Sequence, residues 1–237
     1  MDEDDDGFER IAGRMAHHMN NLVSVIQICA ELLAESQTLE ESERADVATI
    51  LHACDGLGHL GRSLAVIGGL YNPRGPLEAD PVRVAEEAVA SLSEDLQDLR
   101  VVVETGNEER ERALARIGAD DLRRVLVELL TNAREAAVAG SEIAVTLERA
   151  ATEVIVTVTN EIPADLEIPT DQIGVPFHTT RGPGRLGLGF TVAAALLAGV
   201  GGSLSARRVA GSRVSVEVRL PAANHDNENS GSTSPPT

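Results

Sequence analysis

Apolar residues at the start of the chain recur with the spacing of a long helix. Over residues 8–35 they repeat every seven positions, which is typical of helices that pack in bundles. The repeating columns are Met15, Leu22 and Cys29; Val25 and Leu32; and Met19, Ile26 and Leu33. A polar break over residues 37–41 ends this pattern.

A second helix is expected over about residues 41–70. Its apolar side holds Val47, Ile50, Leu51, Cys54, Leu57 and Leu64. The short connection makes the two helices antiparallel neighbours. Because two helices alone cannot enclose a core, we expect a homodimer whose two hairpins form a four-helix bundle. Glycines within the second helix lower its intrinsic stability but permit close packing.

The rest of the chain alternates between strand and helix patterns after a linker, YNPRGP, over residues 71–76. The expected elements are helices over 81–96, 120–136 and 188–197, strands over 99–104, 113–117, 142–148, 153–159, 202–208 and 212–220, and irregular chain over 160–183. This order predicts an α+β protein, with a helical hairpin followed by a two-layer α/β sandwich. We expect domains at residues 1–72 and 77–221, and a disordered polar tail over 222–237.

The helix expected over residues 120–136 is the most regular of these elements. Its apolar face holds Leu122, Val125, Leu126, Leu129, Leu130 and Ala133. Glu128 and Asn132 are four residues apart, so they share one side of the helix. A carboxylate beside an amide can hold a metal-bound phosphate chain. The same spacing also fits an ordinary solvated helix face, and spacing alone leaves both interpretations open.

Composition narrows the classes of function. Hydrophobic residues make up 43% of the 237 residues and charged residues 24%, as in ordinary globular proteins, while aromatic residues make up only 2%. The formal net charge of −18 argues against a nucleic-acid-binding surface. No apolar run approaches the length of a membrane span, so we expect a cytoplasmic protein without membrane insertion. We interpret Cys29 and Cys54 as small core residues in a reducing compartment, with a disulfide as the alternative.

Three segments resemble motifs of one ATPase superfamily. ELLTNAREA, residues 128–136, resembles the N-box of the Bergerat-fold ATPases, which include histidine kinases, gyrase, the heat-shock chaperone ATPase and the mismatch-repair ATPase. The resemblance implies that Asn132 binds the Mg²⁺ that bridges the phosphates of ATP. Glu128 stands where histidine kinases usually have Asn and where the hydrolytic members have Glu.

The other two segments lie in the C-terminal half. PFHTTR, residues 176–181, resembles the F-box, and LGLGFTVAAALLAGVGG, residues 186–202, resembles the G2-box with its following helix. The resemblance implies nucleotide contacts from Thr180, Arg181, Gly187 and Gly189. Glycines before a helix N-terminus let the backbone close on phosphate oxygens, and the helix dipole favours the anion.

The segment that follows the strand over residues 153–159 departs from the family pattern. The family has D-x-G-x-G there, with the Asp accepting a hydrogen bond from adenine. Asn160 stands at the Asp position, and residues 161–165 contain no glycine. An Asn side chain still offers an acceptor for an amino group, but without the charge. This departure implies weakened or lost ATP binding.

MAHHMNNLVSVI, residues 15–26, resembles the H-box of nitrogen-regulation-type histidine kinases. The phosphorylated histidine of that family corresponds to His17, and the helical pattern separately places His17 opposite the apolar stripe. A neutral imidazole has one nitrogen free to attack phosphorus, and Asn21 can orient the ring or a water. The family has Asp or Glu after the phosphoacceptor as a proton acceptor. This chain has His18 there, a poorer one.

These observations lead to one main hypothesis and several alternatives. The main one is a two-component histidine kinase that uses ATP and Mg²⁺ to phosphorylate His17 and passes the phosphoryl group to an aspartate of a response-regulator receiver domain. A pseudokinase-type histidine phosphotransferase would relay phosphate through His17 without ATP. A non-catalytic dimeric adaptor would keep its function in His17→Ala, and a hydrolytic ATPase would depend on Glu128 and form no phosphohistidine.

Overall fold

The computed structural model describes residues 3–36, 38–71, 77–105, 114–166, 187–209 and 211–223. The elements are α1 (Glu3–Ala34), α2 (Glu41–Ile67), α3 (Pro81–Ser91), β1 (Arg100–Thr105), α4 (Ala119–Ala136), β2 (Glu142–Arg149), β3 (Glu153–Glu161), α5 (Gly189–Ala198), β4 (Ser203–Val209) and β5 (Arg213–Pro221). The chain forms two compact units. One consists of Met1–Pro73 with Gln172–Leu196, and the other of Arg74–Asp171 with Leu197–Thr237.

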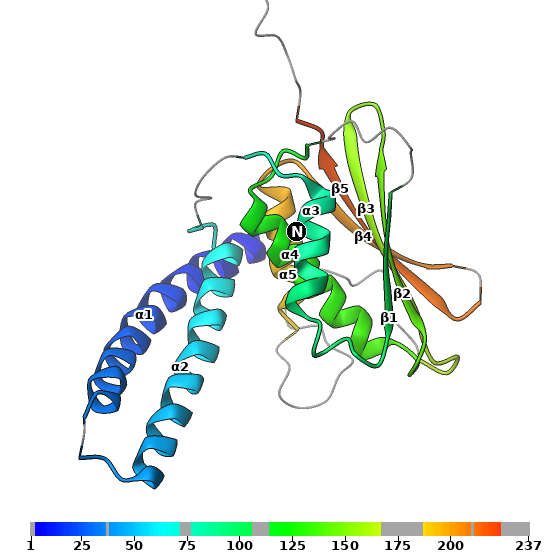
Figure 1. The fold of residues 1–237 in the computed structure, drawn as a ribbon. Helices are drawn as coiled ribbons and strands as arrows, with labels where there is room; N and C mark the ends of the chain where they lie inside the picture. The colour runs from blue at the N-terminus through cyan, green and yellow to red at the C-terminus, as the bar shows by residue number, and fades with distance from the viewer. Residues whose placement is uncertain are drawn as a thin grey trace, which may run out of the picture. The chain divides into compact units, whose positions relative to one another are not determined.

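The first unit contains the expected helical hairpin, with α1 and α2 side by side (Figure 1). Small residues make the contact between the two helices. On α1 they include Ala12, Ala16 and Ala30, and on α2 Cys54 and Gly61, all of them buried. A Cβ atom at Gly61 would lie 2.0 Å from Asn20 Oδ1, so the side chain of Asn20 occupies the space that a side chain at position 61 would need. The prediction that glycines permit close packing is confirmed at Gly61, where the neighbour is a side chain of α1.

The large apolar residues of α1 lie on the other side of the helix. Met15 is 56% exposed and Leu22 is 54% exposed in the single chain. Cys29 belongs to the same column and is also exposed, so its interpretation as a core residue is wrong, whereas Cys54 is buried. The reason is that the Met15–Leu22–Cys29 column precedes each buried residue by one position and therefore faces away from α2. Both cysteines are free thiols.

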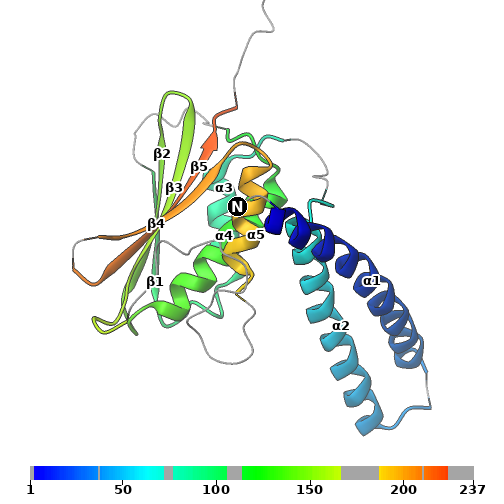
Figure 2. The same ribbon diagram turned by 180° about the vertical axis from the view of Figure 1, so that it is seen from behind.

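The second unit contains a five-stranded sheet in the order β1-β2-β3-β5-β4. β1 and β2 are parallel and are joined through α4, whereas the other neighbours are antiparallel. Helices α3 and α4 cover one face of the sheet, as Figures 1 and 2 show from opposite sides. Alternate residues of β3 point into the core beneath these helices, and Val154, Val156 and Val158 are buried there. The predicted α+β architecture is confirmed.

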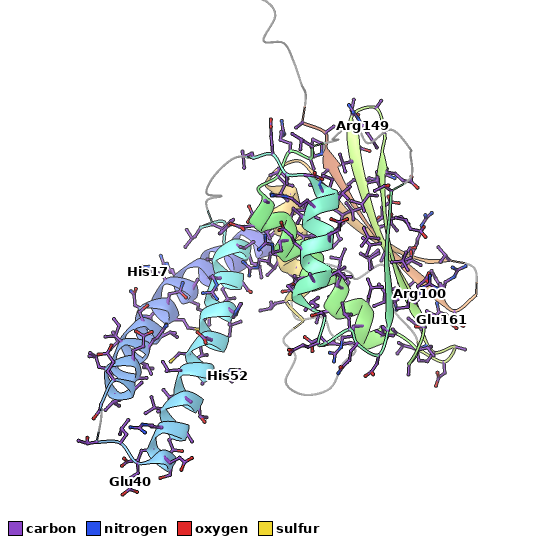
Figure 3. The ribbon with its side chains drawn as sticks, in the orientation of Figure 1. His17, Glu40, His52, Arg100, Arg149 and Glu161 are labelled. Atoms are coloured by element: carbon purple, nitrogen blue, oxygen red, sulfur yellow. The ribbon has the colours of Figure 1, made fainter. Side chains whose placement is uncertain are left out.

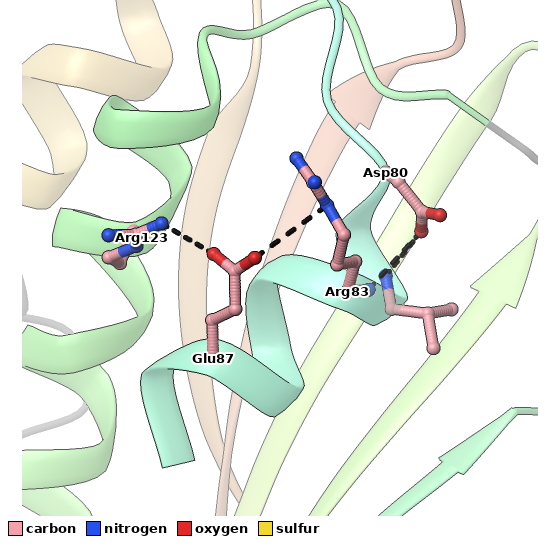
Figure 4. Close-up of polar contacts among 5 residues, drawn as sticks. Asp80, Arg83, Glu87 and Arg123 are labelled. Carbon is pink, nitrogen blue, oxygen red and sulfur yellow. Dashed lines mark hydrogen bonds and ion pairs between the residues drawn. The ribbon is translucent and has the colours of Figure 1, made fainter. Parts of the chain in front are cut away.

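Polar contacts fix α3 at its start and against α4 (Figure 4). Asp80 caps α3, because its Oδ1 accepts hydrogen bonds from the backbone N–H groups of Val82 at 3.1 Å and Arg83 at 3.3 Å. Glu87 of α3 pairs with Arg123 of α4 at 2.5 Å and with Arg83 at 3.7 Å. These contacts hold α4, which carries Glu128 and Asn132, against its neighbour.

Two predicted elements differ from the structure. The strand expected over residues 113–117 is absent from the described part of that range. Ala115 instead forms two isolated bridges, to Ala79 and to Ala222. The helix expected to reach residue 96 ends at Ser91, and turns follow it. The five-residue strand pattern over 113–117 was short, and contacts with Ala79 and Ala222 decided the outcome there.

The open face of the sheet is polar. The hydroxyls of Thr159 on β3 and Ser215 on β5 lie 2.5 Å apart. Arg219 donates hydrogen bonds to Glu217 at 2.7 Å and to Glu153 at 3.1 Å, and these two carboxylates raise the pKa of its guanidinium above the usual value. The apolar core therefore lies on the helix-covered face alone.

Candidate functional site

His17 and Asn21 form a polar pair on the surface of α1 (Figure 3). Both side chains are exposed, and Asn21 Nδ2 lies 3.4 Å from His17 Nε2. The pair exists because residues four apart in a helix are neighbours on its surface. His17 follows the buried Ala16 by one position, so its ring stands to the side of the contact with α2 and is accessible. An accessible imidazole with a neighbouring amide can act as an oriented nucleophile.

His18 is exposed too, but on a different side of α1. Successive residues of a helix are rotated by about 100°, so His18 lies on the side of Met15 and Leu22 rather than beside the ring of His17. A carboxylate at this position would point the same way. The change from the family's Asp or Glu to His18 therefore has two effects. It replaces the proton acceptor, and it changes the side chain that lies beside Met15 and Leu22.

Helix α4 presents Glu128 and Asn132 together. Both are half-buried, one turn apart, and border the buried residues Leu129 and Ala133. Partial burial strengthens electrostatic interactions relative to a fully solvated surface. An oxygen-rich pair in such a position suits a hard cation such as Mg²⁺, which prefers carboxylate and amide oxygens together with phosphate and water.

The segment that leads into α5 has the geometry of a phosphate-binding helix start. Gly187 has φ +62°, a left-handed conformation that glycine adopts without strain, and Gly189 is the first residue of α5. Thr191, in the first turn of α5, is buried, and its Oγ1 has no hydrogen-bond partner among the described residues. A hydroxyl without a partner at a helix start fits an anion. The residues present here therefore fit the phosphate groups of a nucleotide.

The end of β3 differs from the predicted irregular loop. Asn160 lies within the strand, is 4% exposed, and donates from Nδ2 to the carbonyl of Glu161 at 3.4 Å. β3 pairs with β5 as far as Glu161, opposite Arg213. Ile162 continues the pairing, because its N–H donates to the carbonyl of Ser212 at 2.7 Å. The expectation of irregular chain is wrong for residues 160–161, which belong to β3, whereas residues 162–166 lie outside any helix or strand.

Sequence reasoning missed Ile162 as a core residue. It is only 1% exposed, in the stretch where the family has a glycine-containing loop. The signal was present in the sequence, because Val154, Val156 and Val158 alternate in phase with Asn160 and Ile162. The polar Asn160 concealed the continuation of the strand. The end of β3 therefore fits the family pattern less well than the start of α5 does.

The structure places the remaining candidate residues as follows. It brings His17 and Asn21 together on α1, and Glu128 and Asn132 together on α4. Thr180 and Arg181 lie outside the described residues.

Comparison with protein families assigns the C-terminal part of the chain. Residues 118–224 match the family described as "Histidine kinase-, DNA gyrase B-, and HSP90-like ATPase". This match supports an ATPase-type domain in the second part of the chain. The matched segment contains α4, β2, β3, α5, β4 and β5, and with them the candidate residues Glu128, Asn132, Asn160, Gly187 and Gly189.

The similar proteins extend this likeness to the hairpin. The two-component sensor PprA of Pseudomonas aeruginosa is 32% identical in an alignment of 195 residues that covers 78% of this chain and 20% of that protein. The chain therefore spans about one fifth of the length of this relative. The finding supports a sensor histidine kinase core that combines the helical part with the ATPase domain.

Solved structures show the same fold. Full-length ShkA in complex with AMPPNP matches with a TM-score of 0.72 and 19% identity, over 90% of this chain and 45% of that one. The Acinetobacter baumannii histidine kinase AdeS matches with a TM-score of 0.59 and 16% identity, over 85% of this chain and 96% of that one. Among the described helices, none is both long enough and apolar enough to cross a membrane.

Proposed function

We propose that this chain is a two-component histidine kinase. It transfers the γ-phosphoryl group of ATP to His17 and then passes it to an aspartate of a response-regulator receiver domain. The observation that carries the proposal is the exposed His17–Asn21 pair, 3.4 Å apart, on a helical hairpin in the same chain as an ATPase domain of the histidine kinase type. Neither part alone would favour a kinase.

Each residue has a role in this proposal. Asn132, with Glu128 one turn earlier, holds Mg²⁺ at the phosphates. The backbone at Gly187 and Gly189 closes on phosphate oxygens, and the buried hydroxyl of Thr191 donates to one of them. ATP with Mg²⁺ supplies the phosphoryl group and neutralises part of its charge, so positioning and charge neutralisation provide most of the catalysis. Asn21 orients the ring of His17 for attack.

We propose further that the hairpin forms a homodimer. The side of α1 that faces away from α2 carries large apolar residues that are about half exposed or more in the single chain, which is unusual for a solvated surface. They are Ile11, Met15, Leu22, Val25, Ile26, Leu32 and Leu33. A second copy of the hairpin would cover them in a four-helix bundle. The exposed thiol of Cys29 lies in the same column and gives a built-in reporter: dimerisation predicts thiol–thiol crosslinking between two chains under mild oxidation.

The kinase is tested by incubating purified protein with γ-³²P-labelled ATP and Mg²⁺. We expect an acid-labile, base-stable label that is lost in His17→Ala. His52→Ala is the matched control, because His52 is an exposed histidine on the other helix of the hairpin and should leave the label unchanged. A label that persists in His17→Ala would refute the assignment of His17.

One observation favours a second candidate, an ATP-independent histidine phosphotransferase. β3 pairs with β5 as far as Glu161, and the next residue, Ile162, is buried, so the start of the segment where the family has its glycine-containing loop is held against the sheet. Calorimetric titration with ATP and Mg²⁺ separates the two candidates. Millimolar or tighter binding supports the kinase. Absence of binding, together with transfer of phosphate from a phosphorylated receiver domain to His17, would establish the phosphotransferase instead.

A further inference from the structure

The hairpin carries its charges unevenly. Residues 11–30 of α1 and residues 56–71 of α2 and its end contain no Asp or Glu, although the protein has a net charge of −18. The stretch between them, residues 31–55, has one arginine, Arg44, and seven carboxylates. These are Glu31, Glu35, Glu40, Glu41, Glu43, Asp46 and Asp55. His17 lies in the part without carboxylates.

The fold brings the two carboxylate-free segments together. Asn20 lies against Gly61, and Gly13 lies against Leu70, which fixes the antiparallel register of α1 and α2. Residues 11–30 therefore run alongside residues 56–71. These two neighbouring segments together contain no negatively charged side chain, and His17 lies within the first of them.

Two arginines lie near His17 at this end of the hairpin. Arg14 precedes His17 by three residues on α1, so their side chains are surface neighbours, with about 5–6 Å between Cβ atoms. Arg62 follows the buried Gly61 just as His17 follows the buried Ala16. In an antiparallel pair of right-handed helices, residues that follow a buried position lie on the same side of the pair in both helices. Arg62 and His17 thus share one side.

Both arginine side chains are exposed in the single chain, and neither forms a salt bridge within the part of the chain that the structure describes. Arg14 borders the apolar side of α1 that a second copy would cover, whereas Arg62 lies on α2 outside that side. The Nη1 atom of Arg62 lies over Gly58, 3.3 Å from the position that a Cβ atom would occupy there. The missing side chain at Gly58 leaves room for the guanidinium along the helix surface.

Along α1, Arg14 is the Arg, Asp or Glu residue nearest to His17. The acidic start of the chain ends at Glu9, eight residues before His17, which is about 12 Å along a helix. This exceeds the screening length of about 8 Å at physiological ionic strength, whereas Arg14 lies within it. An anion that approaches His17 therefore meets positive charge on an otherwise acidic protein.

We propose that Arg14 and Arg62 are positioning residues that hold the phosphoryl group at His17 while it is transferred to or from the imidazole. This inference rests on the proposed function of His17 as a phosphoacceptor, and it adds the residues that recognise the group being transferred. Guanidinium groups match the geometry of phosphate oxygens and stay charged at every accessible pH.

The test uses phosphoramidate, a small anionic phosphoryl donor that requires neither a partner protein nor ATP. An imidazole nitrogen of His17 forms a new N–P bond with its lone pair while the P–N bond of phosphoramidate breaks, and ammonia leaves with the bonding pair. The rate is followed by mass spectrometry of the peptide that contains His17. We expect the double variant Arg14→Gln/Arg62→Gln to react about three- to tenfold more slowly at low salt, and the difference to shrink as salt is added.

Two controls make the result decisive. Arg44→Gln, at the acidic end of the hairpin, should leave the rate unchanged. Diethyl pyrocarbonate is uncharged, so it should acylate His17 at nearly the same rate in all variants. Equal acylation rates would show that the imidazole remains accessible in each variant. Equal phosphoramidate rates in the wild type and the double variant would overturn this proposal while leaving His17 as phosphoacceptor. If the wild-type His17 is acylated but not phosphorylated, the proposed function fails, and this inference fails with it.

Discussion

The close contact at Gly61 makes a quantitative prediction about the hairpin. An alanine Cβ at this position would lie 2.0 Å from Asn20 Oδ1 and 3.3 Å from Met19 Cε, so side chains must move or the helices must separate. Overpacking of this kind costs about 1–3 kcal/mol, and the higher helix propensity of Ala returns about 0.5–1 kcal/mol. We therefore expect Gly61→Ala to lower the free energy of unfolding by up to about 2.5 kcal/mol.

Gly56 provides the matched control on the same helix. A Cβ atom there meets nothing within 4 Å, so Gly56→Ala should gain the propensity term alone, about 0.5–1 kcal/mol. The difference between the two variants isolates the steric term. Asn20→Ala in the Gly61→Ala background should recover much of the loss, because it removes the atoms that clash, and the double-mutant cycle then assigns the coupling to this pair.

The assay is urea unfolding followed by circular dichroism and by tyrosine fluorescence. Tyr71 is the only tyrosine and the chain has no tryptophan, so its fluorescence reports on the end of the hairpin. All variants are compared at one protein concentration, because dimerisation would make stability concentration-dependent. If Gly61→Ala proved as stable as Gly56→Ala, the close approach of the two helices at Asn20 would be refuted.

Three further predictions concern the second unit. Ile162→Ala should lower the free energy of unfolding by about 2–5 kcal/mol, as for a core residue. The measurement is thermal unfolding followed by circular dichroism. A midpoint within about 2 °C of the wild type would show that this segment is a loop. Gly202→Ala should cost at least as much as Gly61→Ala, because its Cβ would lie 2.6 Å from the backbone carbonyl oxygen of Arg219, which cannot rotate away. Denaturant midpoints that rank the two the other way would contradict this. Asp80→Ala should lower the free energy of unfolding by about 1 kcal/mol because the cap of α3 is lost, whereas Asp80→Asn should keep most of this energy. Equal urea midpoints for the two variants would show that the cap does not stabilise the domain.

The elements with long periodic patterns could be predicted from the sequence. The helix expected over residues 120–136 is α4, Ala119–Ala136, and each apolar position expected on its face is buried. The hairpin expected over residues 202–220 is β4 with β5. In these segments the local pattern and the tertiary environment favour the same structure, so no long-range information was needed.

Other features depended on contacts between distant residues. The sequence of α1 has large apolar residues on one side and small ones on another, and either could face α2. The close fit of Asn20 against Gly61 selects the small side, and this choice exposes Cys29. Similarly, Asn160 ends an apolar run, but pairing of the next residues with Arg213 and Ser212 continues the strand. Periodicity within one segment contains no information about such partners.

The place of β5 in the sheet has a consequence for synthesis of the protein on the ribosome. β5 lies between β3 and β4 and ends at Pro221, so an inner strand of the sheet is made after all the others. A nascent chain that has released only residues up to 209 exposes the unpaired edge of β3 and has no partner for β4. Folding of this domain must then wait for nearly all of its residues, and until that point the β3 edge is a template for wrong pairing between neighbouring nascent chains.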